Sequence, residues 1–409
     1  MVTSLRRAVS GMTAIFLTTA SVVLLTQLSA GASSNNSPVT VSVISQETNP
    51  AFSAPESAGA AAATVKSINE QGGLGGHPVK LITCDDKGDA TTGANCARTA
   101  VQDNAVAVVE GISLEGATIL PVLNASKIPA ILSPVVPADF TNTDAYLKDG
   151  GTVALWSSLG IILAKSGCQK IAVLYDSVNP GSTPAPAEVT AALQTLGGSA
   201  KVVASIGVPE SSPNLTAAIG EVTSAGADCM AWALTPTQGV AAYQAVKQSS
   251  DPSIKIAVIG PDFPNAVAQQ LGSLAKNTLV TNFQYLPGSR QAADFVSVMN
   301  KGGEKIQSSY AQNVYIGFKI LQSALKGHSG PLTAATVTKA LNSDSSISAP
   351  SLPTAIQFHK FASDTTFHRI SNFSIVGYQF NGSTFVALTG PRGVMNTEKA
   401  VAKYVQNLG

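Results

Sequence analysis

The sequence predicts an α/β protein with two doubly wound lobes, each a parallel sheet covered by helices on both faces. Short β-branched runs alternate with Ala-rich segments of helical length from Val39 onward, a pattern typical of right-handed βαβ units. The alternation occurs in two series of about 120 residues each, which indicates two separate sheets. Without the signal peptide predicted below, about 375 residues remain, a length that also suggests two or three domain-sized units.

The first series begins at Val39 and supplies the elements of one lobe. The spacing from Ser53 to Glu56 matches a capping box at the start of its first helix, and Gly72-Gly73 is expected to end that helix. The predicted strands are 39–45, 79–83, 105–110 and 129–133, and the predicted helices are 53–71, 90–103 and 115–126.

The second series follows a junction at 150–158 and supplies the other lobe. After Phe283 the rhythm changes to three consecutive helices, which we expect to return to the first sheet, and then to a final strand pair turning at Asn381-Gly382. The predicted strands are 170–176, 200–206, 229–234, 254–260, 278–283, 373–380 and 383–389. The predicted helices are 185–196, 214–225, 237–249, 263–275, 290–300, 307–326 and 333–342.

The N-terminus reads as a signal peptide over residues 1–32. Arg6-Arg7 precede an apolar run at 12–28, and the small residues Ala30-Gly31-Ala32 follow, so we expect cleavage after Ala32. A retained membrane anchor is the alternative, although the run is interrupted by polar residues and short for a bilayer. No cysteine lies near the cleavage point, so the exported protein is not expected to be lipid-anchored there.

The composition excludes several classes of partner. The net charge is +1 and charged residues make up 12% of the chain, whereas a nucleic-acid-binding surface needs a basic stripe. No metalloprotease, nucleophile-elbow or phosphate-loop motif is present, and the four histidines are isolated. We therefore expect neither an enzyme nor a cofactor, with an exported enzyme built from scattered residues as a minority alternative.

The four cysteines are expected to form two disulfides, since the count is even and the chain is exported. Cys84 and Cys96 close a strand-to-helix loop and lack the ligand set of a zinc site. Cys168 and Cys229 precede or begin strands that can be neighbours in a doubly wound sheet. The aspartates at 85, 86 and 89 offer a cation site as an alternative, but capping of the following helix is preferred.

Several segments resemble branched-chain amino-acid-type substrate-binding proteins, which have the type I periplasmic-binding fold. These are "INEQGGLGGHPVKLITCDD" (68–86), "AVAVVEGISLEGATILPVLNASKIPAILSP" (105–134), "GCQKIAVLYD" (167–176), "SAGADCMAWAL" (224–234) and "IGPDF" (259–263), in the family's order and spacing. The resemblance implies two lobes joined by three crossovers, placed near Ala154, Phe283 and Ser371. The N-terminal lobe then comprises 39–154 and 284–370, and the C-terminal lobe 155–283 and 371–409.

The same resemblance implies a monomeric, extracytoplasmic solute-binding protein that delivers a small polar or amino-acid-like ligand to the membrane permease of an ABC importer. A ligand-sensing module of a signalling system, which shares the fold, is the alternative. The ligand is expected in the cleft beyond the carboxyl ends of the strands, where the strand-following loops provide the candidate residues. These are Glu115, Gly116, Thr118, Ser133, Val135, Pro137, Asp176, Thr235 and Asp262.

Two acidic residues set the expected ligand chemistry. In amino-acid-binding relatives an acidic residue similar to Asp262 pairs with the ligand ammonium group, and hydroxyls from the loops at 111–118 and 133–140 hold its carboxylate. Here Glu115 and Val135 replace such hydroxyl residues, which favours a neutral or cationic ligand with an apolar portion. Glu115 has an alternative as a helix-start carboxylate facing solvent. Phe52, Trp156, Trp232 and Tyr285 are candidates for an aromatic wall, but core packing is the preferred interpretation for each.

Overall fold

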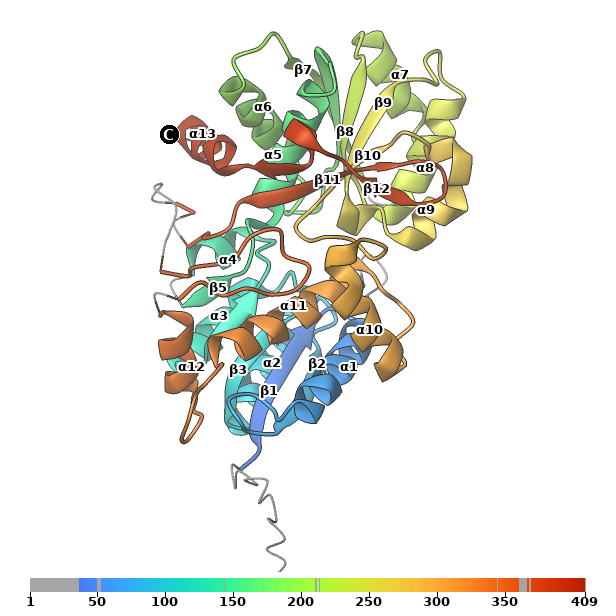
Figure 1. Ribbon diagram of the computed structural model, residues 1–409. Helices are drawn as coiled ribbons and strands as arrows, with labels where there is room; N and C mark the ends of the chain where they lie inside the picture. The colour runs from blue at the N-terminus through green and yellow to red at the C-terminus, as the bar shows by residue number, and fades with distance from the viewer. Residues whose placement is uncertain are drawn as a thin grey trace, which may run out of the picture. The chain divides into compact units, whose positions relative to one another are not determined.

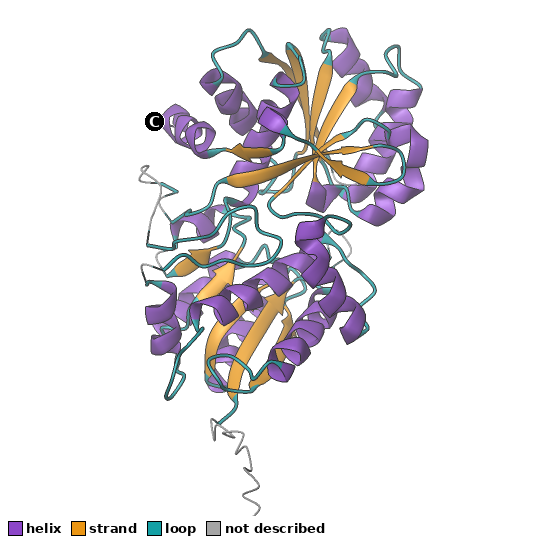
Figure 2. Ribbon diagram, in the orientation of Figure 1, coloured by secondary structure: helices purple, strands orange, loops and turns teal. Residues whose placement is uncertain are grey.

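The structure is a computed structural model that describes residues 37–408 except 50–52, 143, 210–211, 213, 344, 360–365 and 368. The predicted signal peptide lies outside the described residues. Among the helices that are described, none has the length and apolarity needed to cross a bilayer. The described chain forms two sheets with helices packed on them (Figures 1 and 2).

The first sheet is entirely parallel and has the strand order β2-β1-β3-β4-β5. Four of its strands were predicted, whereas the three-residue β5 was not, because so short a run carries no periodicity. The strands are β1 (Val39–Ser45), β2 (Val79–Asp85), β3 (Ala105–Glu110), β4 (Ala130–Leu132) and β5 (Ala145–Leu147).

Helices cover both faces of this sheet, and we call the assembly the first lobe. One face packs against α1 (Ser57–Glu70), α10 (Ala293–Gly302), α11 (Ser309–Ala324) and α12 (Ala334–Leu341). The other packs against α2 (Ala90–Gln102) and α3 (Gly116–Ala125). The three helices that follow the second sheet therefore return to the first, as expected.

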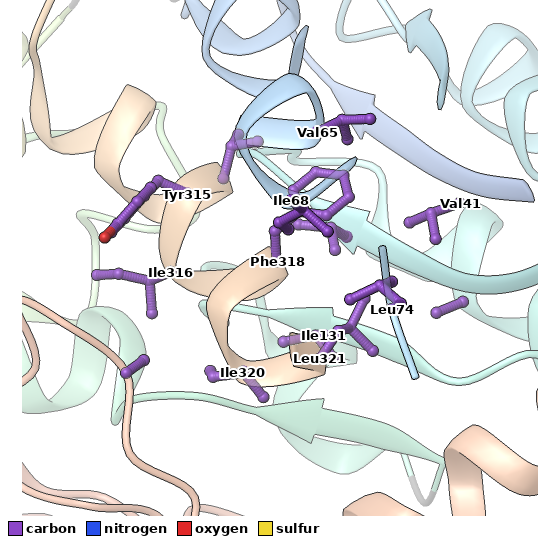
Figure 3. Packing of buried hydrophobic residues seen from close by; sticks show 14 of the residues in the cluster. Val41, Val65, Ile68, Leu74, Ile131, Tyr315, Ile316, Phe318, Ile320 and Leu321 are labelled. Atoms are coloured by element: carbon purple, nitrogen blue, oxygen red, sulfur yellow. The ribbon is translucent and has the colours of Figure 1, made fainter. Parts of the chain in front are cut away.

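The core under α11 explains why this late helix is needed by the first lobe. Figure 3 shows Ile68 of α1 and Phe318 of α11 within one apolar cluster, and both side chains are fully buried. Burying one such side chain stabilises a fold by about 1.5–3 kcal/mol. The α11 segment is buried over most of its length, so it acts as a central core helix.

The second sheet is mixed. Its five parallel strands run in the order β7-β6-β8-β9-β10, and β11 then pairs antiparallel with β10, β12 and β13. The strands are β6 (Lys170–Asp176), β7 (Lys201–Val208), β8 (Cys229–Ala233), β9 (Lys255–Ile259), β10 (Leu279–Asn282), β11 (Ser374–Phe380), β12 (Phe385–Ala387) and β13 (Val394–Asn396). The strand β13 was not predicted.

This sheet and its helices form the second lobe. One face carries α7 (Thr216–Ser224), α8 (Pro236–Lys247) and α9 (Asn265–Leu271), and the other carries α5 (Gly151–Ala164), α6 (Ala185–Thr195) and α13 (Glu398–Leu408). Helix α5 spans the predicted junction near Ala154 and packs on this sheet. The boundaries proposed at residues 154, 283 and 371 stay predictions.

The start of α1 differs from the prediction. The helix begins at Ser57, and Glu56 at its N-cap makes no capping hydrogen bond. The Glu56 carboxylate instead accepts a hydrogen bond from the Ser308 hydroxyl. The prediction of a capping box at Ser53 is therefore wrong, because the Glu56 side chain instead forms a hydrogen bond with Ser308, a residue distant in the sequence.

Both predicted disulfides are present. Cys84–Cys96 joins the end of β2 to α2, and Cys168–Cys229 joins the segment before β6 to the start of β8, its neighbour in the sheet. At the first bridge, Asp89 caps α2 by accepting a 2.7 Å hydrogen bond from Thr92 N, as expected.

Candidate ligand-binding cavity

A cavity of about 80 Å³ lies at the carboxyl ends of strands from both sheets. Its walls come from the loops after β3 and β4 in the first lobe and after β6, β8 and β9 in the second, with further residues from α5 and α11. One water occupies roughly 10–15 Å³ by this measure, so the cavity has room for several waters or a small ligand. This is the position expected for ligands of open α/β sheets.

The cavity lining is mainly apolar, and in the described part of the chain Asp262 is its single charged side chain. The other polar lining side chains are hydroxyls and amides. The lining residues are Ile112, Leu114, Ser133, Pro134, Val135, Thr152, Leu155, Trp156, Asn179, Gly181, Ser182, Leu234, Thr235, Pro236, Ile259, Pro261, Asp262, Phe283, Tyr310 and Asn313.

Asp262 follows β9 in a short 3₁₀ turn. Burial, reinforced by the nearby charge of Asp176, raises the pKa of the Asp262 carboxyl well above its ordinary value. Asp176 ends β6, and its Oδ1 accepts hydrogen bonds from Val178 N and Asn179 N at 3.0 and 3.3 Å. Its Oδ2 is buried with no hydrogen-bond partner among the described residues, so this side of the cavity favours positive charge.

Ser133 lines the cavity, but its hydroxyl is already committed. It donates a 2.5 Å hydrogen bond to Asp149 Oδ2 and accepts one from Lys148 Nζ. The Lys148 and Asp149 side chains are buried and 3.8 Å apart. Burial lowers the pKa of Lys148 and raises that of Asp149, and their mutual attraction opposes both shifts.

Asp139 forms hydrogen bonds with backbone N–H groups of the loop after β4. Its Oδ2 accepts hydrogen bonds from Val135 N and Val136 N at 2.8 and 3.0 Å, and burial raises its pKa to about 6 despite these bonds. The carboxylate approaches α3 so closely that a Cβ on Gly116 would lie 1.7 Å from Asp139 Oδ1. Glycine at 116 is therefore required by this approach.

Asp86 and Glu110 are two further buried carboxyl groups of the first lobe. Asp86 accepts hydrogen bonds from Ser113 Oγ at 2.5 Å and Gly88 N at 2.9 Å. Both carboxylate oxygens of Glu110 are buried without a hydrogen-bond partner in the described part of the chain. Burial, followed by the charges of Asp139 and Asp86, raises the pKa of Glu110 well above its ordinary value.

Helix α11 contributes two lining residues that sequence reasoning missed, Tyr310 and Asn313. Ser308 caps the helix by accepting hydrogen bonds from Tyr310 N and Ala311 N, both at 3.1 Å. The Asn313 Oδ1 atom is buried with no partner among the described residues. The polar pair at 312 and 313 within a buried apolar helix was the available signal.

The four proposed aromatic residues have different places. Trp156 lines the cavity, and its Nε1 donates a 2.7 Å hydrogen bond to the Gly181 carbonyl. Trp232 is a core residue whose ring lies 4.6 Å from that of Tyr243, and Tyr285 packs against the same core. Phe52 lies outside the described residues.

Four of the nine predicted ligand residues line the cavity, namely Ser133, Val135, Thr235 and Asp262. Asp176 does not line the cavity, although its charge acts on Asp262, and Pro137 is exposed at the start of α4 (Pro137–Thr141). The three residues around the start of α3 do not line it either. These are Glu115, which faces Gly93 of α2, Gly116, which faces Asp139, and Thr118, which bonds the Glu115 carbonyl.

One group of potential metal-ligating side chains occurs in the described part of the chain, Cys168, Asp228 and Cys229. Its cysteines are bonded to each other, and the Asp228 carboxylate accepts hydrogen bonds from Gln169 N and Lys170 N. The aspartates at 85, 86 and 89 instead accept hydrogen bonds from nearby backbone and hydroxyl groups.

Two α/β lobes with a cavity at their facing strand ends define a class of two-lobed ligand-binding protein. The model of the periplasmic binding protein family matches residues 38–374, and the chain belongs to that family. No match is found among curated proteins.

Solved structures share the fold. The leucine-binding protein LivK of Thermotoga maritima is 16% identical, with a TM-score of 0.67 over 88% of this chain and 99% of that one. A solute-binding protein of an ABC transporter from Rhodopseudomonas palustris, in complex with 3,4-dihydroxybenzoic acid, is 17% identical, with a TM-score of 0.70 over 88% and 97%. A putative branched-chain amino acid ABC transporter protein from Rhodospirillum rubrum is 15% identical, with a TM-score of 0.65 over 86% and 100%.

Proposed function

We propose that this chain is the solute-binding component of an ABC importer, which captures a small polar or amino-acid-like molecule and presents it to a membrane permease. The observation that carries the proposal is the cavity, whose walls come from both lobes. A molecule held there contacts both lobes at once. It therefore stabilises their closed arrangement, in proportion to its greater affinity for that arrangement.

An apolar contact between the lobes suits hinge bending. The Phe367 ring lies 4.9 Å from Phe140 of α4 and 6.3 Å from Tyr404 of α13. These residues belong to one apolar cluster that includes parts of both lobes. The contact keeps the lobes together on one side while the loops at the cavity move.

The predicted export signal and the family membership support an extracytoplasmic location. We propose that the protein acts there as a monomer. Two other roles compete. A sensor module would bind ligand and engage a signalling partner without supporting uptake, whereas an enzyme would convert its ligand.

Binding is tested by isothermal titration calorimetry of the purified protein against amino acids, amides, polyamines and small organic acids. We expect saturable binding with one ligand per chain and no turnover. Gly181→Leu should abolish it, because the added side chain enters the cavity, where a Cβ already lies 3.5 Å from Val135 Cγ1. Gly198→Leu is the matched control, since a Cβ there meets no atom within 4 Å.

Transport is tested separately, by measuring uptake of the bound compound in cells with and without the chain. Loss of uptake on deletion supports the importer role. Binding with unchanged uptake would favour the sensor, and chemical conversion of the compound would favour the enzyme.

A further inference from the structure

The hydrogen-bond donors beside the loop after β4 are used inside the protein. The Ser133 hydroxyl donates to Asp149, and the Thr152 hydroxyl donates a 3.1 Å hydrogen bond to the Val135 carbonyl. The N–H groups of Val135 and Val136 donate to Asp139. A ligand carboxylate placed against this loop finds these donors already occupied by Asp149, Asp139 and the Val135 carbonyl.

The side chains that remain on this wall are apolar. Ile112 and Leu114 follow β3, and Pro134 and Val135 follow β4. An anion pressed against them loses its hydration without compensating hydrogen bonds, and the buried Asp139 carboxylate at this loop repels it.

Other residues that line the cavity offer hydrogen-bond acceptors. Among the described residues, Asp262 is the one charged side chain that lines the cavity, and no lysine, arginine or histidine lines it. Asn313 Oδ1 is a further buried acceptor, without a partner among the described residues. Charge-assisted hydrogen bonds from an ammonium group to such acceptors are among the strong ones in proteins.

We propose that the cavity selects a ligand with a primary ammonium group on an apolar body and with no carboxylate. The inference rests on the proposed function and names its substrate class. Asp262 pairs with the ammonium group, the apolar wall holds the body, and the acid Asp139 opposes a carboxylate. Discrimination thus comes from a repulsive element as well as an attractive one.

Matched compounds that share a body test this selection. One set is leucine, its decarboxylated amine 3-methylbutan-1-amine, and its deaminated acid 4-methylpentanoate. The aromatic set is phenylalanine, 2-phenylethylamine and 3-phenylpropanoate. By titration calorimetry we expect the amine in at least one set to bind at least about tenfold tighter than the other two members.

Single-residue variants test whether the cavity residues cause the preference for an amine. Asp262→Asn should weaken amine binding at least about thirtyfold, as removal of one partner from a buried charge pair does, whereas Glu221→Gln, on the exposed surface of α7, should leave it unchanged. Asp139→Asn should raise the affinity for the carboxylate compounds by about threefold or more, because it removes a repelling charge. Circular dichroism confirms that each variant is folded.

The outcomes separate this inference from the proposed function. If an amino acid or a carboxylic acid binds tightest and Gly181→Leu abolishes that binding, the solute-binding role stands and the ammonium selection is overturned. If no compound in these sets or the wider library binds saturably, both are overturned. A tight amine whose affinity is unchanged in Asp262→Asn also overturns the inference.

Discussion

The Ser133 hydroxyl, at the edge of the cavity, donates a 2.5 Å hydrogen bond to the buried Asp149 carboxylate. Lys148 donates to the same hydroxyl, so Ser133 links two buried charges. Its role is therefore to hold this pair in place behind the cavity wall, and its hydroxyl is not free to bind a ligand carboxylate.

Ser133→Ala should accordingly destabilise the protein more than it weakens ligand binding. Leaving buried groups without a hydrogen-bond partner costs about 1–3 kcal/mol, and urea denaturation measures this loss. The dissociation constant of the ligand should change by less than about threefold. Ser224→Ala, on the exposed surface of α7, controls for a serine-to-alanine change. A large loss of affinity with unchanged stability would show that Ser133 binds the ligand directly.

The two disulfides should contribute unequally to stability. Cys168–Cys229 encloses a separation of 61 residues and Cys84–Cys96 one of 12. In the chain-entropy model a longer loop restricts the unfolded chain more, so the expected contributions are about 4 and about 3 kcal/mol. Urea denaturation of the two Cys→Ser double variants measures both. Equal losses, or a larger loss for the shorter loop, would contradict this ordering.

Much of the fold was predictable because its signal is local. The strands at 39–45, 105–110 and 170–176 match β1, β3 and β6 residue for residue, since β-branched runs bounded by turn residues identify strands directly. The elements β5, α4 and β13 were missed because these short segments lie outside the regular alternation of strands and helices from which the fold was predicted. The strand β13, which precedes helix α13, pairs antiparallel with β11.

The site was predictable only in part. Loops after strands were expected to line the cavity, and those after β3, β4, β6, β8 and β9 do so, because the fold class determines where strand ends meet. Tyr310 and Asn313 come from α11, which reaches the cavity only through tertiary packing. The commitment of Ser133 to Lys148 and Asp149 was equally hidden, because a Lys-Asp pair in a loop usually faces solvent.

Glu188 should make the protein less stable as the pH rises. It is buried in α6, its Oε2 has no partner among the described residues, and burial raises its pKa from an ordinary 4.5 to about 8. Between these values the unfolded chain releases the proton that the native state retains. The stabilisation is therefore complete below pH 4.5 and is lost as the pH rises through about 8.

Glu188→Gln should remove this dependence and exceed the parent protein in stability by on the order of 2 kcal/mol at pH 8. Denaturation midpoints measured across this pH range test the expectation. Glu398→Gln, in the exposed first turn of α13, is the matched control. Parallel pH profiles for the parent protein and Glu188→Gln would show that Glu188 does not retain its proton.

Amine binding should weaken as the pH falls, because the ammonium group pairs with the ionised form of Asp262. Burial and the charge of Asp176 raise the pKa of Asp262 well above its ordinary value, so the carboxyl gains a proton at a higher pH than an exposed aspartate does. A bound cation favours the ionised carboxylate, and binding at the lower pH values therefore releases a proton to the buffer.

Titration calorimetry from about pH 8 to about pH 5, a range in which an aliphatic amine stays charged, measures both effects. The dissociation constant should rise as the pH falls, and the apparent enthalpy should vary with the ionisation enthalpy of the buffer. Asp262→Asn should lose both dependences, whereas Glu221→Gln should keep them. An affinity that is constant over this range would mean that the ligand does not pair with the Asp262 carboxylate, and the ammonium group would then have to be held by neutral acceptors alone.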